Sequence, residues 1–275
     1  MLQPNIFNTF LVIPILNVLM GFNKLFELVH LPGALGFSIV ALTLSVRGLL
    51  HPFFKQQMDT ARKMQEIKPH LDKLGEKHKK DAKKLQEEQL KLYQEAGINP
   101  AAGCLFMVVQ IPIFIALYQT LGLFFTPDIH KVILAINKVL YLSFLHVKAV
   151  DLWFLGLNLA TTPQKAHNIL YYAIPIITAA LQYLQVQTSA PSMGMQTAAK
   201  VEDSKKPSSA KALAGEEKKD GVGGDFQKAM NTQMKYIFPL MIGWFSLSMP
   251  VGLSLYWNIF SLFSIIQYKQ MGKKK

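Results

Sequence analysis

Long apolar runs alternate with strongly polar segments along this chain. A helix that crosses the hydrocarbon core of a bilayer needs about 20 mostly apolar residues. The pattern therefore predicts an all-α, polytopic membrane protein with a five-helix transmembrane core. The candidate spans lie at residues 31–54, 103–125, 168–187, 233–249 and 251–268.

The last two spans are joined by a very short connection, Met249-Pro250-Val251-Gly252. Proline cannot continue a helix interior and glycine relaxes the backbone, so together they favour a tight turn between antiparallel helices. Residues 233–275 are predicted to form a transmembrane hairpin that ends in a short basic tail.

Residues 1–30 are also apolar, but Pro14 interrupts the run, and Asn17, Lys24 and Glu27 add polar positions. A secretory signal peptide would carry positive charge before its apolar stretch, whereas no Lys or Arg precedes Lys24. Our interpretation is an interfacial helix on the external side. A sixth span and a cleaved signal peptide are the alternatives.

Charge is distributed unevenly along the chain. It is 51% apolar and 17% charged, yet its net charge is +12. Residues 55–99, 188–235 and those after 268 hold 23 of the Lys and Arg residues, and the other loops hold five. By the positive-inside rule, the richer group is cytoplasmic and the region before the first span is outside. We expect a multi-pass protein of the cell (plasma) membrane, bacterial since no transit peptide is recognisable, with no direct DNA binding.

Residues 55–100 combine high charge with a narrow apolar seam. Steps of three and four residues place the seam on one face of each of two helices, and the seam lapses at 78–81. We predict a cytoplasmic antiparallel helical hairpin; a solvated charged connector is the alternative. The seam residues are Met64, Ile67, Leu71 and Leu74, followed by Ala82, Leu85, Leu92 and Ala96.

Two other loops differ in kind. Residues 188–232 are rich in Ser, Ala, Gly and Lys without an apolar period, which predicts a flexible cytoplasmic loop. The external segment 126–167 holds two apolar stretches together with Lys138, Tyr141 and Trp153. These residue types suit the headgroup boundary, so we expect the stretches to lie at the membrane interface.

Arg47 is the most informative single residue, because apolar residues flank it on both sides. An arginine at the centre of a membrane helix costs about 2.5–3.5 kcal/mol, so it either faces a protein cavity or snorkels to the headgroups. Both alternatives stay open here. Polar side chains of other predicted spans that could share a hydrophilic groove with it are Gln110, Gln182, Gln185 and Asn258, which is next to Trp257.

The sequence carries no sign of catalytic chemistry. The single cysteine, Cys104, excludes both a disulfide framework and a cysteine-based metal site. No Walker loop, His-Glu-x-x-His helix or nucleophile elbow is present. We therefore expect a protein that is not an enzyme and needs no cofactor and no metal.

In their order along roughly residues 30–270, seven motifs resemble the YidC/Oxa family of membrane protein insertases. They are Val46-Arg47-Gly48 with His51-Pro52, Met64-Gln65 with Lys68-Pro69, the run from Leu92 to Pro100, Gly103-Cys104, the run from Gln110 to Tyr118, Tyr171-Tyr172 with Pro175, and the run from Pro250 to Trp257.

The resemblance implies an insertase and chaperone that inserts nascent membrane proteins into the lipid bilayer through a hydrophilic groove, without nucleotide hydrolysis. Arg47 would receive hydrophilic parts of the substrate, and we expect the chain to act as a monomer. The Sec translocon and the ribosome are further candidate partners. The resemblance also implies a hydrophobic slide for the substrate, formed by Cys104, Met107, Ile111, Phe114, Phe238, Met241 and Phe245.

Two other functions remain as alternatives. A small-solute channel or carrier would need a continuous polar path or an inverted repeat. A receptor for tail-anchored proteins, built on the same superfamily core, usually has three spans. The loop at 188–232 is longer than the family's usual link, and the basic tail is shorter than those that contact ribosomes in some members.

Overall fold

The computed structural model describes residues 5–78, 81–99, 101–126, 128–189 and 233–272. The loop predicted at 188–232 lies almost wholly outside the described residues. The described chain is mostly helical, as an all-α membrane protein requires. The exception is a short antiparallel ribbon of β1 (Trp153–Phe154) and β2 (Leu157–Asn158), whose turn residues Leu155 and Gly156 both have positive φ. That backbone geometry matches the right-handed twist of a two-residue hairpin.

The N-terminal helix is continuous from Asn8 to Leu28. A π-helical turn, η1 (Asn8–Val12), runs directly into α1 (Ile13–Leu28). Pro14 does not interrupt the helix, contrary to the sequence interpretation, because it directly follows the π-helical turn, a local adjustment that accommodates its missing N–H. Length and composition make this helix able to cross a membrane, so its placement as an interfacial helix stays a prediction.

The next helix pair is sharply bent. Helix α2 (Ala34–Leu49) meets α3 (His51–Lys77) at an angle of 64°. Pro52 lies at the start of α3, and Leu50 connects the two helices. The apolar run predicted as a span at 31–54 therefore bends near its end. Helix α4 (Ala82–Glu95) follows α3 and packs against it.

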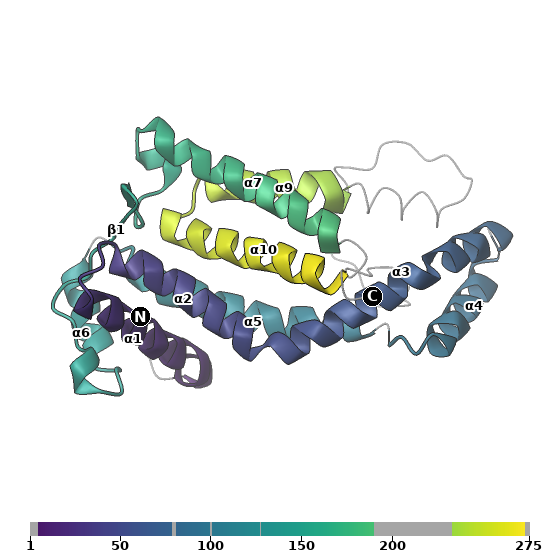
Figure 1. Ribbon diagram of the computed structural model, residues 1–275, viewed down its shortest axis with the longest axis horizontal. Helices are drawn as coiled ribbons and strands as arrows, with labels where there is room; N and C mark the ends of the chain where they lie inside the picture. The colour runs from purple at the N-terminus through teal and green to yellow at the C-terminus, as the bar shows by residue number, and fades with distance from the viewer. Residues whose placement is uncertain (1–4, 79–80, 100, 127, 190–232, 273–275) are drawn as a thin grey trace, which may run out of the picture.

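Three long helices form the remainder of the bundle with α2. They are α5 (Ala101–Leu123), α7 (Ile169–Ser189) and α10 (Val251–Gly272). A π-helical turn, η4 (Gln233–Ile237), leads into the shorter α9 (Phe238–Ser246). Helix α10 lies between α7 and α2, and α9 packs on α7 (Figure 1).

Length and apolarity single out only part of this bundle as membrane-crossing. Within the described residues, Asn8–Leu28 and Ile169–Thr188 are long and apolar enough to span, and the bent pair α2–α3 adds a third if it forms one span. Gln110–Leu123, the part of α5 whose side chains are described, is apolar but shorter than a full span. The five-helix core therefore remains a prediction.

The segment at 126–167 closes one end of the bundle. It contains α6 (Ile129–Asn137), the β-ribbon and two short 3₁₀ turns, η2 (Ser143–Leu145) and η3 (Pro163–Lys165). Several of its apolar side chains are buried in the protein core, among them Val132, Ile133, Ile136 and Leu159. These side chains pack on the helices rather than against lipid, and the placement of the two stretches at the membrane interface stays a prediction. Tyr141 and Trp153 remain exposed.

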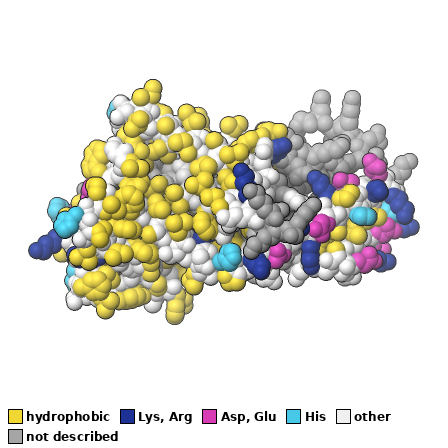
Figure 2. Space-filling view, viewed as in Figure 1, with side chains coloured by type: hydrophobic (Ala, Val, Ile, Leu, Met, Phe, Trp, Pro, Cys, Tyr) yellow, Lys and Arg dark blue, Asp and Glu magenta, His cyan; other side chains and the backbone are white. Residues whose placement is uncertain are grey.

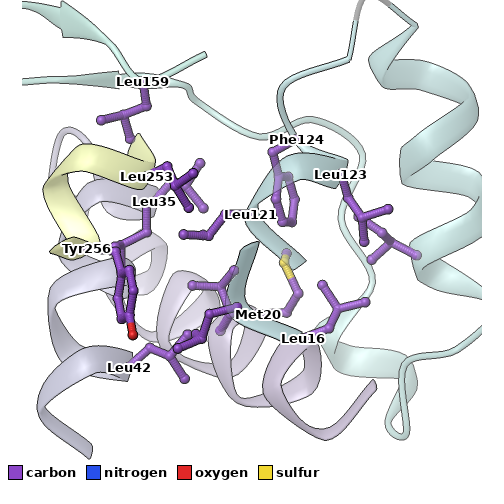
Figure 3. Packing of buried hydrophobic residues seen from close by; sticks show 14 of the residues in the cluster. Leu16, Met20, Leu35, Leu42, Leu121, Leu123, Phe124, Leu159, Leu253 and Tyr256 are labelled. Carbon is purple, nitrogen blue, oxygen red and sulfur yellow. The ribbon is translucent and has the colours of Figure 1, made fainter. Parts of the chain in front are cut away.

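The core joins α1, α2, α5 and α10. Leu16 and Met20 of α1 lie beside Leu121 and Phe124 at the end of α5 (Figure 3). The β-ribbon packs closely on α2, because a Cβ added to Gly36 of α2 would lie 2.1 Å from the Phe154 ring. Hydrophobic side chains also cover much of the outer surface of the bundle, whereas charged ones gather on α3 and α4 (Figure 2).

Candidate functional site: a buried arginine and its polar surroundings

Arg47 lies in the last turn of α2 and is only 4% exposed. Its guanidinium points to α10, where it donates hydrogen bonds to Gln267 Oε1 and to the Phe260 carbonyl, each at 3.2 Å, and to the Ser264 hydroxyl. Burial between helices shows that this side chain does not snorkel to the headgroups.

Aromatic rings cover the guanidinium. Its central carbon lies 4.2 Å from the ring centroid of Phe54 and 3.8 Å from that of Phe260. These distances are within the range of cation–π attraction, which is strongest where water is excluded. Phe54 belongs to the first turn of α3, so residues on both sides of the 64° bend hold Arg47.

No carboxylate is seen to neutralise this charge. The four ion pairs found in the described part of the chain involve other cations, and Arg47 Nε is buried without a hydrogen-bond partner. A buried cation that is held only by neutral groups keeps much of its desolvation cost. The site is therefore electrostatically suited to receive an anionic group.

A small pocket adjoins Arg47 between α2, α5 and α10. Its cavity volume is about 10 Å³, which is room for about one water molecule. Gln110 lines this pocket with Arg47, so the structure brings these two predicted groove residues together. The other lining residues are Thr43, Val46, Leu50, Phe54, Ile113, Tyr256 and Phe260.

The remaining predicted groove residues form a second group, at the contact between α7 and α10. Trp257 Nε1 donates a hydrogen bond of 2.9 Å to the buried Gln182, and the Trp257 ring meets Phe114 of α5 edge to face. Asn258 Oδ1 is buried and has no hydrogen-bond partner. Gln185 is half-buried one turn beyond Gln182.

Sequence reasoning missed the residues that hold Arg47, namely Phe54, Phe260, Ser264 and Gln267. One signal was available for the polar ones. Polar residues recur at steps of three and four along α10, at Ser254, Asn258, Ser261 and Ser264, which places them on one helix face. Three of these, Ser254, Ser261 and Ser264, are buried.

The predicted slide residues lie in three kinds of surroundings. Cys104 and Met107 belong to the part of α5 whose side chains are not described. Ile111, Met241 and Phe245 are more than half exposed, whereas Phe114 and Phe238 are half-buried. Helix α9 buries Pro239, Gly243 and Ser246 and turns a large apolar face outward, which includes Leu240, Met241, Trp244 and Phe245.

Helices α3 and α4 share a small apolar cluster. Leu71, Tyr93 and Ile98 are buried in it, and the predicted seam residues Met64, Ile67 and Leu92 pack around them. Leu85 is half-buried outside the cluster. Burial raises the pKa of the Tyr93 hydroxyl above its ordinary value.

Polar contacts lie near the junction of α3 and α4. His78 Nε2 lies 3.0 Å from Glu88 Oε2, and Asp81 caps α4 by accepting a 3.1 Å hydrogen bond from the Lys84 N–H. Among the described residues, no three His, Cys, Asp or Glu side chains gather closely enough to hold a metal ion.

Comparison with known proteins gives one consistent result. The family model described as 60Kd inner membrane protein matches residues 27–275. The chain is 32% identical over 250 residues to a membrane protein insertase YidC of Oceanobacillus iheyensis, covering 87% of this chain and 77% of that one. It is 31% identical over 251 residues to the chloroplast inner membrane ALBINO3-like protein 1 of Chlamydomonas reinhardtii, covering 86% and 43%.

A YidC of Aquifex aeolicus is also 31% identical, over 86% of this chain and 34% of its own length. The chain spans about half the length, or less, of the chloroplast relatives that it matches.

Proposed function

The chain belongs to the YidC/Oxa family of 60Kd inner membrane proteins, and on this premise we propose that it is a membrane protein insertase and chaperone. Its substrates would be nascent membrane proteins, and its site of action the lipid bilayer. The observation that carries the proposal is Arg47: a buried cation, beside a small pocket that Gln110 also lines, whose partners are all neutral.

An acidic or polar stretch of a substrate replaces these neutral partners in the proposed mechanism. A carboxylate accepts two parallel hydrogen bonds from a guanidinium, and such charge-assisted bonds are stronger than those to an amide or a hydroxyl. The pocket is too small for a polypeptide, so Phe54 or Phe260 has to move aside when the substrate enters. Gln110, Gln182 and Trp257 extend the polar surface for the rest of the stretch.

The apolar segment of the substrate supplies the driving force. Burial of apolar surface is worth about 25 cal/mol per Å², so a segment of about 20 residues needs no nucleotide hydrolysis to enter the lipid. The exposed apolar face of α9, with Met241 and Phe245, offers a guiding surface. Ile111 and Phe114 of α5 do the same on the other side of the proposed groove.

The fold supports a particular arrangement for this task. We place five spans in the membrane, with the N-terminal region outside and the C-terminus in the cytoplasm, where the positive-inside rule puts the Lys-rich segments. Helices α3 and α4 then project into the cytoplasm as a hairpin that can meet the Sec translocon or the ribosome. The chain acts as a monomer in this arrangement.

The decisive experiment compares Arg47→Ala, Arg47→Lys and Arg62→Ala in proteoliposomes that receive a single-spanning substrate with a short acidic tail. Arg62 is the matched control, because it is an exposed arginine paired with Glu66 at 3.5 Å. Since a hydrogen bond to a charged group contributes about 1.5–3 kcal/mol, Arg47→Ala is expected to lower protease-protected substrate by about tenfold or more. Arg47→Lys should retain part of the activity.

Equal insertion by Arg47→Ala and Arg62→Ala would refute the role of Arg47. Flux of small solutes through the purified protein, without insertion of the substrate, would favour a channel or carrier instead.

A further inference from the structure

A rigid loop at the end of the bundle opposite to α3 and α4 presents apolar side chains outward. It comprises residues 138–146, between the end of α6 and Val147. The side chain of Asn137 closes its neck, because Nδ2 donates to the Val147 carbonyl at 2.9 Å and Oδ1 accepts from the Val147 N–H at 3.1 Å. A loop whose ends are joined in this way is a compact Ω-type loop.

A second asparagine fixes the loop to α1. Asn17 Oδ1 accepts a 2.7 Å hydrogen bond from the Tyr141 N–H, and Asn17 Nδ2 donates to the Val139 carbonyl at 3.3 Å. Leu140 and Leu145 anchor the loop from inside, since both are buried in the main core. The conformation of the loop is therefore set before anything binds it.

Three neighbouring side chains point away from this support. Tyr141, Leu142 and Phe144 are 63%, 54% and 61% exposed. Large apolar side chains that are held outward by a rigid backbone mark an interaction surface rather than a core.

The charges around the loop indicate what covers it. Lys138 and Lys148 are exposed. They directly follow Asn137 and Val147, whose hydrogen bonds close the neck, so both lysines lie at the neck of the loop. In the described part of the chain neither forms an ion pair. Leu134 of α6 and Val18 of α1, which follows Asn17 in the sequence, are also exposed apolar side chains. Apolar tips below a cationic rim match the boundary between acyl chains and lipid phosphates.

We propose that residues 138–148 form a lipid-interface anchor, in which Tyr141, Leu142 and Phe144 insert at the headgroup boundary and Lys138 and Lys148 bind lipid phosphates. The anchor holds this end of the bundle at a fixed depth in the bilayer. It does not depend on the proposed insertase activity, because it uses neither Arg47 nor the helices around it.

Spin labels test the insertion of the loop. In a Cys104→Ser background, single cysteines are placed at Leu142 and Phe144 of the full chain, which is reconstituted in phosphatidylcholine vesicles. Two reference positions calibrate the signal: Trp244 on the exposed apolar face of α9, and Lys83 on the charged face of α4. Labels at Leu142 and Phe144 should collide with oxygen, which concentrates in lipid, more than with a water-soluble nickel complex, as at Trp244.

A label at Phe144 that behaves like the one at Lys83 would overturn the proposal. So would a label shielded from both reagents, since that result means that protein covers the loop.

Anionic lipid tests the two lysines separately. With phosphatidylglycerol in the vesicles, the ratio of immersed to water-exposed label at Phe144 should rise by about fivefold for each lysine near the surface. The double variant Lys138→Gln, Lys148→Gln should lose this gain. An unchanged gain in the double variant would refute the phosphate contacts.

Asn137→Ala opens the neck and should lower the immersion of the Phe144 label in either lipid; equal immersion would show that the closed neck is not needed.

Discussion

At Arg47, the two aromatic rings and the polar partners stabilise the same charge by different means. The hydrogen bonds come from α10, whereas the rings of Phe54 and Phe260 come from two elements that meet at the guanidinium. Removal of a ring leaves the hydrogen bonds intact but admits water to one side of the cation. The two contributions are therefore separable by substitution.

We expect Phe260→Leu and Phe54→Leu each to lower the free energy of unfolding in mild detergent by about 0.5–2 kcal/mol, the range of a cation–π contact. Leucine keeps most of the apolar volume, so the loss reports mainly on the ring. Phe263→Leu is the comparison variant and should lose less, because that ring lies 6.0 Å from the guanidinium carbon, at the limit of the contact. A control that loses as much as Phe260→Leu would contradict the assignment.

The sequence identified Arg47 but not the residues that hold it. An arginine inside an apolar run is conspicuous in one dimension, and its cost in lipid is known in advance. Ser264 and Gln267 lie more than two hundred residues further along the chain, in a helix whose Ser254 and Trp257 bind other partners. Only the packing of α10 against α2 determines which of them reach the guanidinium.

The contact between α7 and α9 depends on small residues. A Cβ added to Gly243 would lie 2.7 Å from Ala179 Cβ and 3.2 Å from the Pro175 carbonyl oxygen, and neither neighbour is a flexible side chain. Gly243→Ala should therefore destabilise the protein by about 1–3 kcal/mol, the usual cost of overpacking. Unfolding in detergent measures it. Gly122→Ala, where nothing lies within 4 Å, should be neutral or stabilising; equal losses would contradict the close packing.

Tyr93 makes the contact between α3 and α4 sensitive to alkali. Burial raises its pKa above the unfolded value of about 10. The neutral form is therefore favoured in the folded protein, so its stabilising effect is complete below pH 10 and is lost as the pH rises through the folded pKa. The tyrosinate absorbance that distinguishes the wild-type chain from Tyr93→Phe should appear at a higher pH than that of free tyrosine. Its appearance at the ordinary pH would show that Tyr93 is accessible to water.

Helices could be predicted from the sequence where capping residues and the apolar period agree. Asp81 precedes α4 and caps it, and an apolar period of three and four residues marks both neighbouring helices. The segment at 126–167 was harder, because an apolar stretch looks the same whether protein or lipid covers it. Val132 and Ile136 face the core while Tyr141 faces outward, and that division follows from the fold rather than from the residue types.

At the scale of the whole molecule, orientation is the property that the sequence predicts most directly. In the Cys104→Ser background, Lys83→Cys on α4 and Lys165→Cys in η3 should react with an impermeant maleimide from opposite sides of the membrane. We expect the cysteine at 165 to be labelled in intact cells and the one at 83 only after permeabilisation, since Lys-rich segments stay in the cytoplasm. Labelling of both in intact cells would contradict the proposed topology.

The bend at Leu50 lets α3 act as a lever, with Phe54 close to the pivot and Lys77 far from it. At about 1.5 Å per helical residue, Phe54 lies roughly 6 Å from the pivot and Lys77 roughly 40 Å from it. Any swing about Leu50 that keeps α3 intact thus moves the far end about seven times as far as the ring on Arg47. A protein bound to the far end would be displaced by several ångströms whenever that ring shifts by one, so binding at Arg47 would be transmitted to a partner about 40 Å away.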